Sequence, residues 1–326
     1  MNRIEFPRIG ADGKKYTKED IQQWYRDTVE SGIEKRLKDL HHRTTIEDQR
    51  SFIQELIDNL GTLLIGEPAE LEVIKDSLHN DYAIISSADV YKPHKAKGEK
   101  VVHSFSEALL SAMNFDNYRK NELVELSCKL NIKVCPYCNH NYTLYIDDKR
   151  KTWSKGLFQF DHFYNKATYP YLSMSLYNLI PSCSLCNHQK TTTSLNLRYN
   201  PYYRGISKEF RFEVDDNIQL RSGIKGADKI QIKIRKTPNG QGIDELKDEL
   251  HLEEQYGRHK DIVQEIYDKV YNEKYYRDML ACIPNSAEFI NQWIGIPMSE
   301  EDIDKQPLTK FRQDILKQAR QEYARG

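Results

Sequence analysis

Two Cys-x-x-Cys pairs constrain this chain more than any other feature of its sequence. Cys135 and Cys138 form the first pair, Cys183 and Cys186 form the second, and 44 residues (139–182) separate them. Two residues between thiolates allow one tight turn to present both sulfurs to a zinc ion at about 2.3 Å. The separation is too wide for one compact finger, so we expect a structural zinc that clamps two distant knuckles together. Buried free thiols or a redox pair are the alternative.

The composition limits what the rest of the chain can be. With 39% hydrophobic and 11% aromatic residues, the 326 residues can bury a core, and they suffice for two domains or for one domain with a large appendage. The 48 Lys and Arg residues against 49 Asp and Glu exclude a uniformly basic coat, so any polyanion site must be a local patch. No stretch approaches the roughly 18 consecutive apolar residues of a membrane helix, and the N-terminus has no apolar signal core. We therefore expect a cytoplasmic protein with no membrane partner.

The N-terminal part, residues 1–95, has a helical pattern. Thr17 opens a Thr-x-x-Asp sequence typical of a capping box, and apolar residues at helical spacing follow as far as Leu37. A second helical segment is expected from Thr45. The polar stretch 91–100 indicates a boundary. The apolar faces of these helices are expected to form a core or a surface that docks a partner.

The C-terminal part, residues 206–326, begins with a different pattern. Alternating apolar residues over 210–214 and 230–234 predict a small antiparallel sheet with one solvated face. A helical pattern returns over 244–280. Further helices are expected over residues 104–113, 116–130, 287–294 and 308–323.

The segment between the cysteine pairs carries several chemically capable residues. Residues 158–163 alternate apolar and polar like a strand and contain the adjacent pair Asp161 and His162. Neighbouring side chains of a strand point to opposite faces, so this pair can serve one site only if the strand bends or ends there. More polar residues follow, one before the second cysteine pair and two after it: Asn178, Asn187 and Lys190.

This order of residues resembles the HNH endonuclease family, which has a ββα-metal fold. The strings at 160–163, 169–170 and 177–183 are most similar to the PtuB-like branch, whose members accompany an ABC-type ATPase, PtuA, in Septu-type and retron-associated bacterial antiphage systems. The resemblance covers residues 130–205. Asn187 stands where the family often has His, and an amide oxygen suits Mg²⁺ better than an imidazole does. The resemblance implies nuclease activity, a PtuA-like ATPase partner and a role in defence.

The chemistry of phosphodiester hydrolysis gives each residue an expected role. The reaction needs an activated water and stabilisation of charge on the phosphate oxygens. His162 is the expected general base, because an ordinary histidine pKa lies near neutrality. Asp161 and Asn187 are expected to hold one Mg²⁺ or Mn²⁺ ion, Asn178 to orient His162 or its loop, and Lys190 to contact phosphate. The alternative makes these residues an ordinary strand end, a turn and a helix cap.

Local charge favours a polyanionic substrate. Residues 139–212 contain ten Lys or Arg against four acids, a net charge of +6, and Lys149-Arg150-Lys151 is expected on a loop between two strands. Ten of the 21 tyrosines lie between residues 137 and 203, which would allow stacking on bases, although for any single tyrosine a core position is the better interpretation. The histidines that we expect at the surface or beside the zinc rather than as ligands are His140, His188, His251 and His259.

Together these patterns predict an α+β protein in three parts: a helical region (1–95), a zinc-braced ββα-metal HNH domain (96–205) and a sheet with helices (206–326). The predicted function is a metal-dependent HNH endonuclease that cuts nucleic acid, with DNA favoured over RNA. Two other functions stay open. One is a zinc-organised nucleic-acid-binding module with an inactive nuclease centre, and the other is a scaffold whose helical ends grip a partner.

Overall fold

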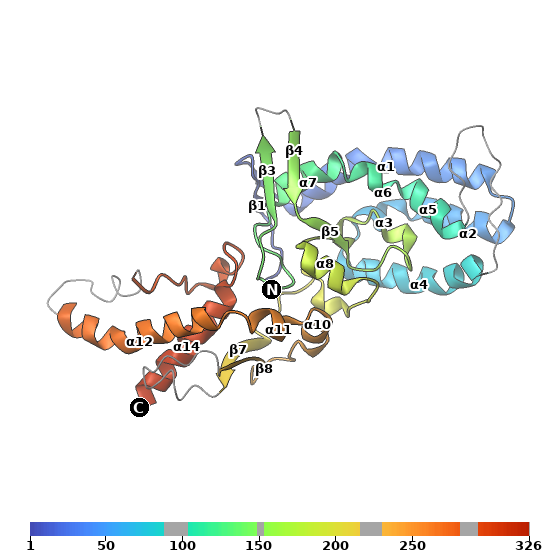
Figure 1. Ribbon diagram of the computed structural model, residues 1–326. Coiled ribbons are helices and arrows are strands. Elements are labelled where there is room, and N and C mark those ends of the chain that lie inside the picture. Colours follow the sequence, from blue (N-terminus) through green and yellow to red (C-terminus); the bar gives the residue numbers. More distant parts are fainter. Residues whose placement is uncertain (88–103, 149–152, 216–229, 281–292, 326) are drawn as a thin grey trace. The chain divides into compact units, whose positions relative to one another are not determined.

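Helices and two-stranded antiparallel sheets make up this chain, which confirms the predicted α+β class (Figure 1). The computed structural model describes residues 1–87, 104–148, 153–215, 230–280 and 293–325. Three sequence predictions fall wholly or largely outside these described residues: the boundary at 91–100, the basic tripeptide 149–151 and the helix over 287–294.

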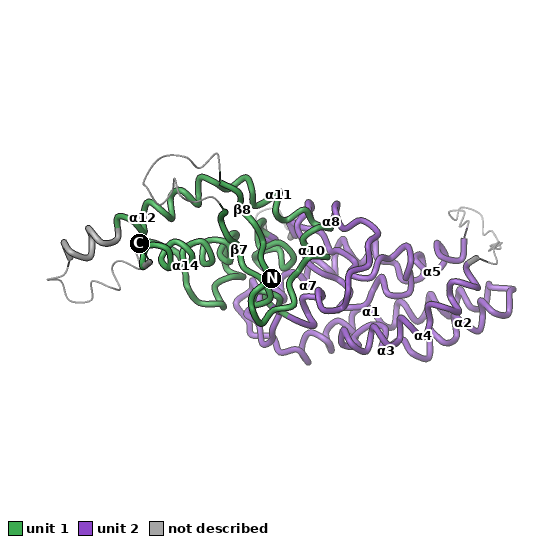
Figure 2. Tube along the Cα trace, turned by 90° about the horizontal axis from the view of Figure 1, so that it is seen from below, with its two compact units in different colours: residues 1–2, 133–142, 205–326 green, residues 3–132, 143–204 purple. Residues whose placement is uncertain are grey.

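The chain divides into two units (Figure 2). The larger unit contains residues 3–132 and 143–204, and the smaller contains residues 1–2, 133–142 and 205–326. The sequence analysis instead placed boundaries after residues 95 and 205. The first of these boundaries lies outside the described residues, and the helices before it belong to the same unit as the strands of the central segment.

The larger unit begins with α1 (Lys18–Arg43), whose start the sequence specifies. Thr17 accepts a hydrogen bond from the backbone of Asp20, and Asp20 accepts one from the backbone of Thr17, so the capping box forms as predicted. The buried side chains of α1 form one stripe: Ile21, Tyr25, Val29, Ile33, Leu37 and Leu40. The Tyr25 hydroxyl donates to the Met174 carbonyl at 2.8 Å. This long helix therefore contacts the loop that contains Met174.

The second predicted helical segment is broken into shorter helices. They are α2 (Glu47–Asp58), α3 (Leu60–Ile65) and α4 (Pro68–Ser87). The first break lies at Asn59, which is both the C-cap of α2 and the N-cap of α3. Three more helices follow in the same unit: α5 (Phe105–Met113), α6 (Phe115–Tyr118) and α7 (Glu122–Leu130). Of these, α5 and α7 pack on α1.

Two strands and a helix succeed one another in the central segment. β5 (Gln159–His162) pairs antiparallel with β6 (Leu179–Ser182), and α8 (Ser184–Lys190) follows β6 directly. The loop between the strands contains two single 3₁₀ turns, η1 (Pro170–Leu172) and η2 (Leu176–Asn178). A separate hairpin precedes β5; its strands are β3 (Leu144–Asp148) and β4 (Trp153–Leu157). Strand β4 leads into β5 across the single residue Phe158.

The smaller unit contains the predicted antiparallel sheet, formed by β7 (Phe210–Asp215) and β8 (Gln231–Lys236). Buried and partly exposed residues alternate along both strands, as expected for one solvated face. The helices of this unit are α10 (Asp244–Glu249), α11 (Leu252–Tyr256), α12 (Lys260–Leu280) and α14 (Thr309–Arg325). Helix α14 packs against α12 and β7.

Short elements complete the described chain. They are β1 (Arg8–Ile9), β2 (Lys15–Tyr16), η3 (Leu197–Tyr199) and η5 (Glu300–Asp302). Among the helices in the described ranges, none combines the length and the apolar character that a bilayer-spanning segment needs.

Candidate functional site

All four predicted cysteines come together in one buried cluster. The Sγ atoms of Cys135, Cys138, Cys183 and Cys186 lie within 4.8 Å of one another. A tetrahedral zinc with bonds of about 2.3 Å places its sulfurs about 3.8 Å apart, so the cluster is compatible with structural zinc. Within the described residues, it is the one group of three or more His, Cys, Asp or Glu side chains placed to hold a metal ion.

Local backbone geometry explains why each cysteine pair turns tightly. In the first pair, Asn139 has a left-handed φ of 53°, and its amide donates to the Cys135 carbonyl at 2.9 Å. The amide of His140 then donates to the Cys138 sulfur at 3.3 Å, a bond that favours the thiolate form. In the second pair, Cys183 is the N-cap of α8 and Cys186 lies in its first turn. A helix N-terminus also favours thiolate.

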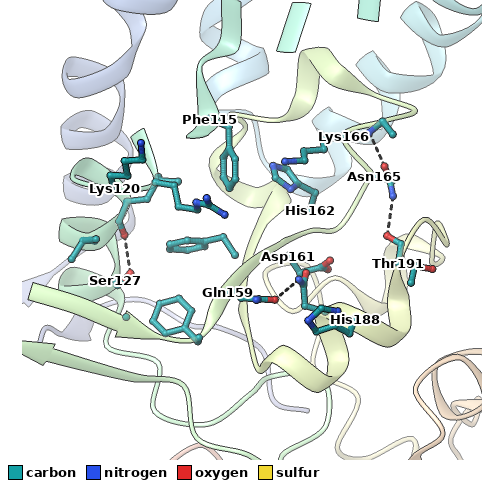
Figure 3. Close-up of a pocket in the computed structure, with 18 of the residues that line it drawn as sticks. Phe115, Lys120, Ser127, Gln159, Asp161, His162, Asn165, Lys166, His188 and Thr191 are labelled. Atoms are coloured by element: carbon teal, nitrogen blue, oxygen red, sulfur yellow. Dashed lines mark hydrogen bonds between the residues drawn. The ribbon is translucent and has the colours of Figure 1, made fainter. Parts of the chain in front are cut away.

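A pocket of about 740 Å³ lies beside β5 (Figure 3). Asp161, His162 and Asn187 line it together. The geometric condition on neighbouring strand residues is met because β5 ends at His162, where the chain leaves the extended conformation. Asn178 and Lys190 do not line this pocket, and both are fully buried.

His162 is held in one tautomer. Its Nε2 atom lies 3.0 Å from the Ser173 carbonyl, which can only accept, so Nε2 carries the proton and Nδ1 keeps a lone pair. The ring packs edge-on against Phe115, with centroids 4.5 Å apart. Burial lowers the pKa of His162 to about 3; the charge of Lys166 acts in the same direction, and the bond to Ser173 opposes it. His162 is therefore a neutral imidazole at pH 7, able to accept a proton.

Asn178 fixes the loop that carries the partner of His162. Its Nδ2 atom donates to the carbonyls of Leu172 at 2.9 Å and Tyr164 at 3.1 Å, and its Oδ1 accepts from the Tyr164 amide at 2.7 Å. These bonds join the start of the loop to the residue just before Ser173. Asn178 therefore acts on His162 through the loop rather than by direct contact, which is one of the two arrangements that the sequence analysis anticipated.

Lys190 does not have the predicted position. Its ammonium is fully buried, donates to the His162 carbonyl at 2.8 Å, and lies 3.3 Å from the Asp161 carboxylate. A phosphate in the pocket cannot reach a side chain with no exposed surface, so the expected phosphate contact is wrong. The physical reason is the electrostatic cost of burying Asp161, which Lys190 offsets. Lys190 instead joins α8 to the end of β5.

Asn187 lies at the pocket with an oxygen available. Its Nδ2 atom donates to the Gln159 side-chain oxygen, the contact drawn beside Asp161 in Figure 3. In the described part of the chain, its Oδ1 atom has no hydrogen-bond donor. Asp161 and Asn187 thus offer two hard oxygen ligands at one pocket, the donor type that Mg²⁺ prefers. His188 also lines the pocket and is exposed.

The pocket rim is braced by a residue that the sequence analysis did not single out. Asn165 donates to the Thr191 carbonyl at 2.9 Å and accepts from the Ala167 amide (Figure 3). Thr191 has a φ of 41°, a left-handed conformation that is rare for a β-branched residue. The chain is therefore strained where α8 ends at the pocket, and Asn165 holds that strained turn in place.

Two of the three cations at the pocket come from a part of the chain that no motif marked, and the third, Lys166, lies in the basic segment 139–212. Arg119, Lys120 and Lys166 all line the pocket. Arg119 and Lys120 lie between α6 and α7, far from the cysteine pairs in sequence, so only the fold brings them near β5. The Lys166 ammonium lies 5.0 Å above the Phe115 ring. The tripeptide 149–151, which the sequence analysis favoured, lies outside the described residues.

Two of the other histidines pair with each other. The Nε2 atoms of His140 and His259 lie 2.7 Å apart, and both rings pack near Tyr256. His259 is therefore half-buried and partnered rather than a simple surface residue. Such a short contact requires one ring to donate and the other to accept, so at least one of the two imidazoles is neutral. His251 is exposed, as expected.

Comparisons with known proteins add no relative to this description. No protein-family model matches the chain, and neither the curated proteins nor the solved structures contain a match.

Proposed function

We propose that this protein is a metal-dependent nuclease of the HNH type, with its active site in the pocket beside β5. The observation that carries the proposal is the state of His162. It is a neutral imidazole at the end of a strand, oriented by the Ser173 carbonyl and placed beside a carboxylate in an open pocket. The order β5, loop, β6, α8 is the order that a ββα-metal centre requires.

His162 acts as the general base in this proposal. Its Nε2–H remains bonded to Ser173, so the lone pair of Nδ1 is the site that takes a proton from the attacking water. The loop keeps the ring in this orientation through the three hydrogen bonds of Asn178. A pKa of about 3 leaves His162 unprotonated at pH 7 but makes it a weak base, so the proposal requires the negative charge of a bound phosphate to raise this pKa.

Asp161 and Asn187 would hold the divalent cation, Mg²⁺ or Mn²⁺. When bound, this ion would neutralise charge on the phosphate and on the departing oxygen. One carboxylate that already balances a buried ammonium is a weak ligand set. Mg²⁺ sites often draw further ligands from substrate phosphates. We therefore expect tight cation binding only when nucleic acid is present.

The cations at the pocket support a polyanionic substrate. Lys120 is exposed, Lys166 is partly exposed, and neither forms an ion pair with an acidic side chain in the ranges that the structure describes. Arg119 pairs with Asp116 at 3.7 Å at an exposed position, where such a pair contributes about 0–1 kcal/mol. Phosphate groups can therefore use these side chains without breaking a strong interaction.

Cleavage by purified full-length protein tests the proposal. With Mg²⁺ or Mn²⁺ the protein should cut plasmid DNA, oligonucleotide or RNA, and His162→Ala should abolish cutting while zinc content stays unchanged. His188→Ala is the matched control, because His188 lines the same pocket but is exposed and has no role in the proposal. Equal cleavage by the wild type and His162→Ala would remove His162 from the mechanism.

One observation favours the alternative of a binding module with an inactive centre. The Lys190–Asp161 pair neutralises the carboxylate that a cation would need. If nucleic acid binds in the presence of Mg²⁺ or Mn²⁺, with or without a partner, yet stays uncut, this alternative is correct.

The resemblance to PtuB-like proteins extends the proposal to a biological role. It supports a nuclease effector in antiphage defence, with an ABC-type ATPase as partner. Co-expression with an ATPase encoded beside the gene, followed by purification of a complex, tests this part. A stable complex whose nuclease activity depends on the ATPase is the expected result, and a chain that protects cells without any such partner would contradict it.

A further inference from the structure

Two aromatic rings line the same pocket as Asp161 and His162. Phe158 and Phe160 both line it and are only partly buried, and their rings pack edge-to-face with centroids 5.3 Å apart. The residues between and after them, Gln159 and Asp161, line the same pocket. Strand β5, which carries the carboxylate, thus also carries Phe160, and Phe158 directly precedes it. We call this pair the phenyl shelf.

Gly156 helps to hold the shelf in place. A Cβ atom at this position would lie 2.6 Å from the ring of Phe158, so the ring occupies the space that any other residue would fill. Phe158 therefore rests on the backbone of β4 on one side and on Phe160 on the other. A ring fixed in this way loses little entropy when a ligand stacks on it.

Three cationic side chains line the same pocket as the phenyl shelf. Arg119, Lys120 and Lys166 line it, together with apolar side chains of α7 such as Leu123. Nucleic acid offers two matching features, an anionic backbone and flat bases. Aromatic rings beside cations are the arrangement by which proteins bind single strands without sequence preference.

From this geometry we infer that the pocket takes an unpaired nucleotide, with its base stacked on the phenyl shelf and its phosphates at Lys120 and Lys166. This inference rests on the proposed function and names its substrate class, a single-stranded or locally unpaired nucleic acid. In a duplex the faces of the bases are covered by their neighbours, so a shelf within a concave pocket can stack only on a base that has left the helix. Single-stranded DNA and single-stranded RNA both have this chemistry.

Binding measured without cleavage tests the inference. Full-length His162→Ala protein is titrated into fluorescent oligonucleotides of one sequence, as single-stranded DNA, single-stranded RNA and duplex DNA, and anisotropy is recorded. An otherwise identical strand with abasic sites keeps the phosphates but removes the bases. At least one unpaired strand should bind about tenfold or more tighter than the duplex and than the abasic strand. The unpaired strand that binds more tightly shows whether the site prefers deoxyribose or ribose.

Variants of the shelf separate stacking from charge. On that background, Phe158→Leu keeps an apolar side chain but lacks a π-face, and Gly156→Ala displaces the Phe158 ring without removing it. Both should weaken binding of the unpaired strand several-fold and leave duplex binding unchanged. Tyr203→Ala is the control, because Tyr203 is an exposed ring outside the pocket. Melting curves that match the parent exclude misfolding as the cause.

The outcomes distinguish this inference from the proposed function. Duplex and unpaired strands of equal affinity, or shelf variants with parental affinity, overturn the inference. Wild-type protein that binds unpaired strands through the shelf but cuts nothing overturns the proposed function and leaves the inference standing. Protein that cuts unpaired strands equally well with Phe158→Leu supports the nuclease and overturns the shelf.

Discussion

The cysteine cluster and the pocket beside β5 are both built from polar residues, but they are organised in opposite ways. The cluster consists of four identical buried ligands that close around one position. The pocket is lined by a carboxylate, an imidazole and an amide from Asp161, His162 and Asn187, and each is held by a different partner. Structural metal sites are closed, whereas catalytic sites keep an open position for substrate. This difference is the reason why we propose a stabilising metal at the cluster and chemistry at the pocket.

The largest expected effect is loss of the cysteine cluster. Cys135→Ser should unfold the surrounding structure rather than slow a reaction, because structural zinc contributes about 10–16 kcal/mol of binding energy to folding in zinc-finger peptides. Metal content and melting temperature measure this effect. Cys128→Ser is the matched control, since Cys128 lies in α7 outside the cluster. Full zinc occupancy and an unchanged melting temperature in Cys135→Ser would contradict a structural role.

The second largest effect should come from Lys190, whose buried ammonium contacts Asp161 at the pocket. Lys190→Met should lower the free energy of unfolding by about 3–5 kcal/mol, because it removes the ammonium that balances the buried Asp161 carboxylate. The double variant Lys190→Met with Asp161→Asn should recover much of this loss. Denaturant titration measures both. If the two single changes simply add in the double variant, the pair is not coupled.

Acid should lower the stability of the folded protein through His162. Its folded pKa of about 3 lies below the ordinary value of 6.5, so between these values the unfolded chain binds more protons. Its contribution to stability is complete above pH 6.5 and is lost as the pH falls toward 3, by up to about 1.4 kcal/mol per pH unit. Denaturant titration from pH 7 to pH 4 measures the slope. It should decrease in His162→Gln.

The smallest effect should come from the cations at the pocket. Lys166→Gln should weaken nucleic-acid binding by a modest factor and reduce the slope of log affinity against log salt concentration by about 1. The free energy of unfolding should change by less than about 0.5 kcal/mol, because Lys166 is partly exposed and makes no ion pair among the described residues. A large stability loss without a change in salt dependence would make Lys166 a structural residue.

The elements that the sequence could predict are those with a local physical cause. The capping box at Thr17 and the alternation along β7 each depend on neighbouring residues, and both are present. The break at Asn59 was missed, because the apolar pattern continues through it and packing on α1 determines where the helix divides.

In the candidate site, too, only the residues with a local sequence signal could be predicted. The four cysteines could be grouped from spacing alone, whereas the partners of the other residues are distant in sequence. Lys190 has a helical position that fits a phosphate contact, and only the depth of Asp161 explains why it turns inward. Arg119 and Lys120 carry no motif, since their relation to β5 arises from the packing of α7 against the β3–β4 hairpin. The alternation over 158–163 was visible in the sequence, but it did not show that Phe158 and Phe160 line the pocket.

Chemical rescue of His162 tests the central claim most directly. Removing a general base lowers a rate by about 10²–10⁴-fold, and a small imidazole can replace it only if the pocket is open to solvent at that point. We predict that His162→Ala cuts nucleic acid at a strongly reduced rate with Mg²⁺ or Mn²⁺, and that added imidazole restores a large part of it. Unreduced cleavage by His162→Ala would contradict the claim that this histidine is the base.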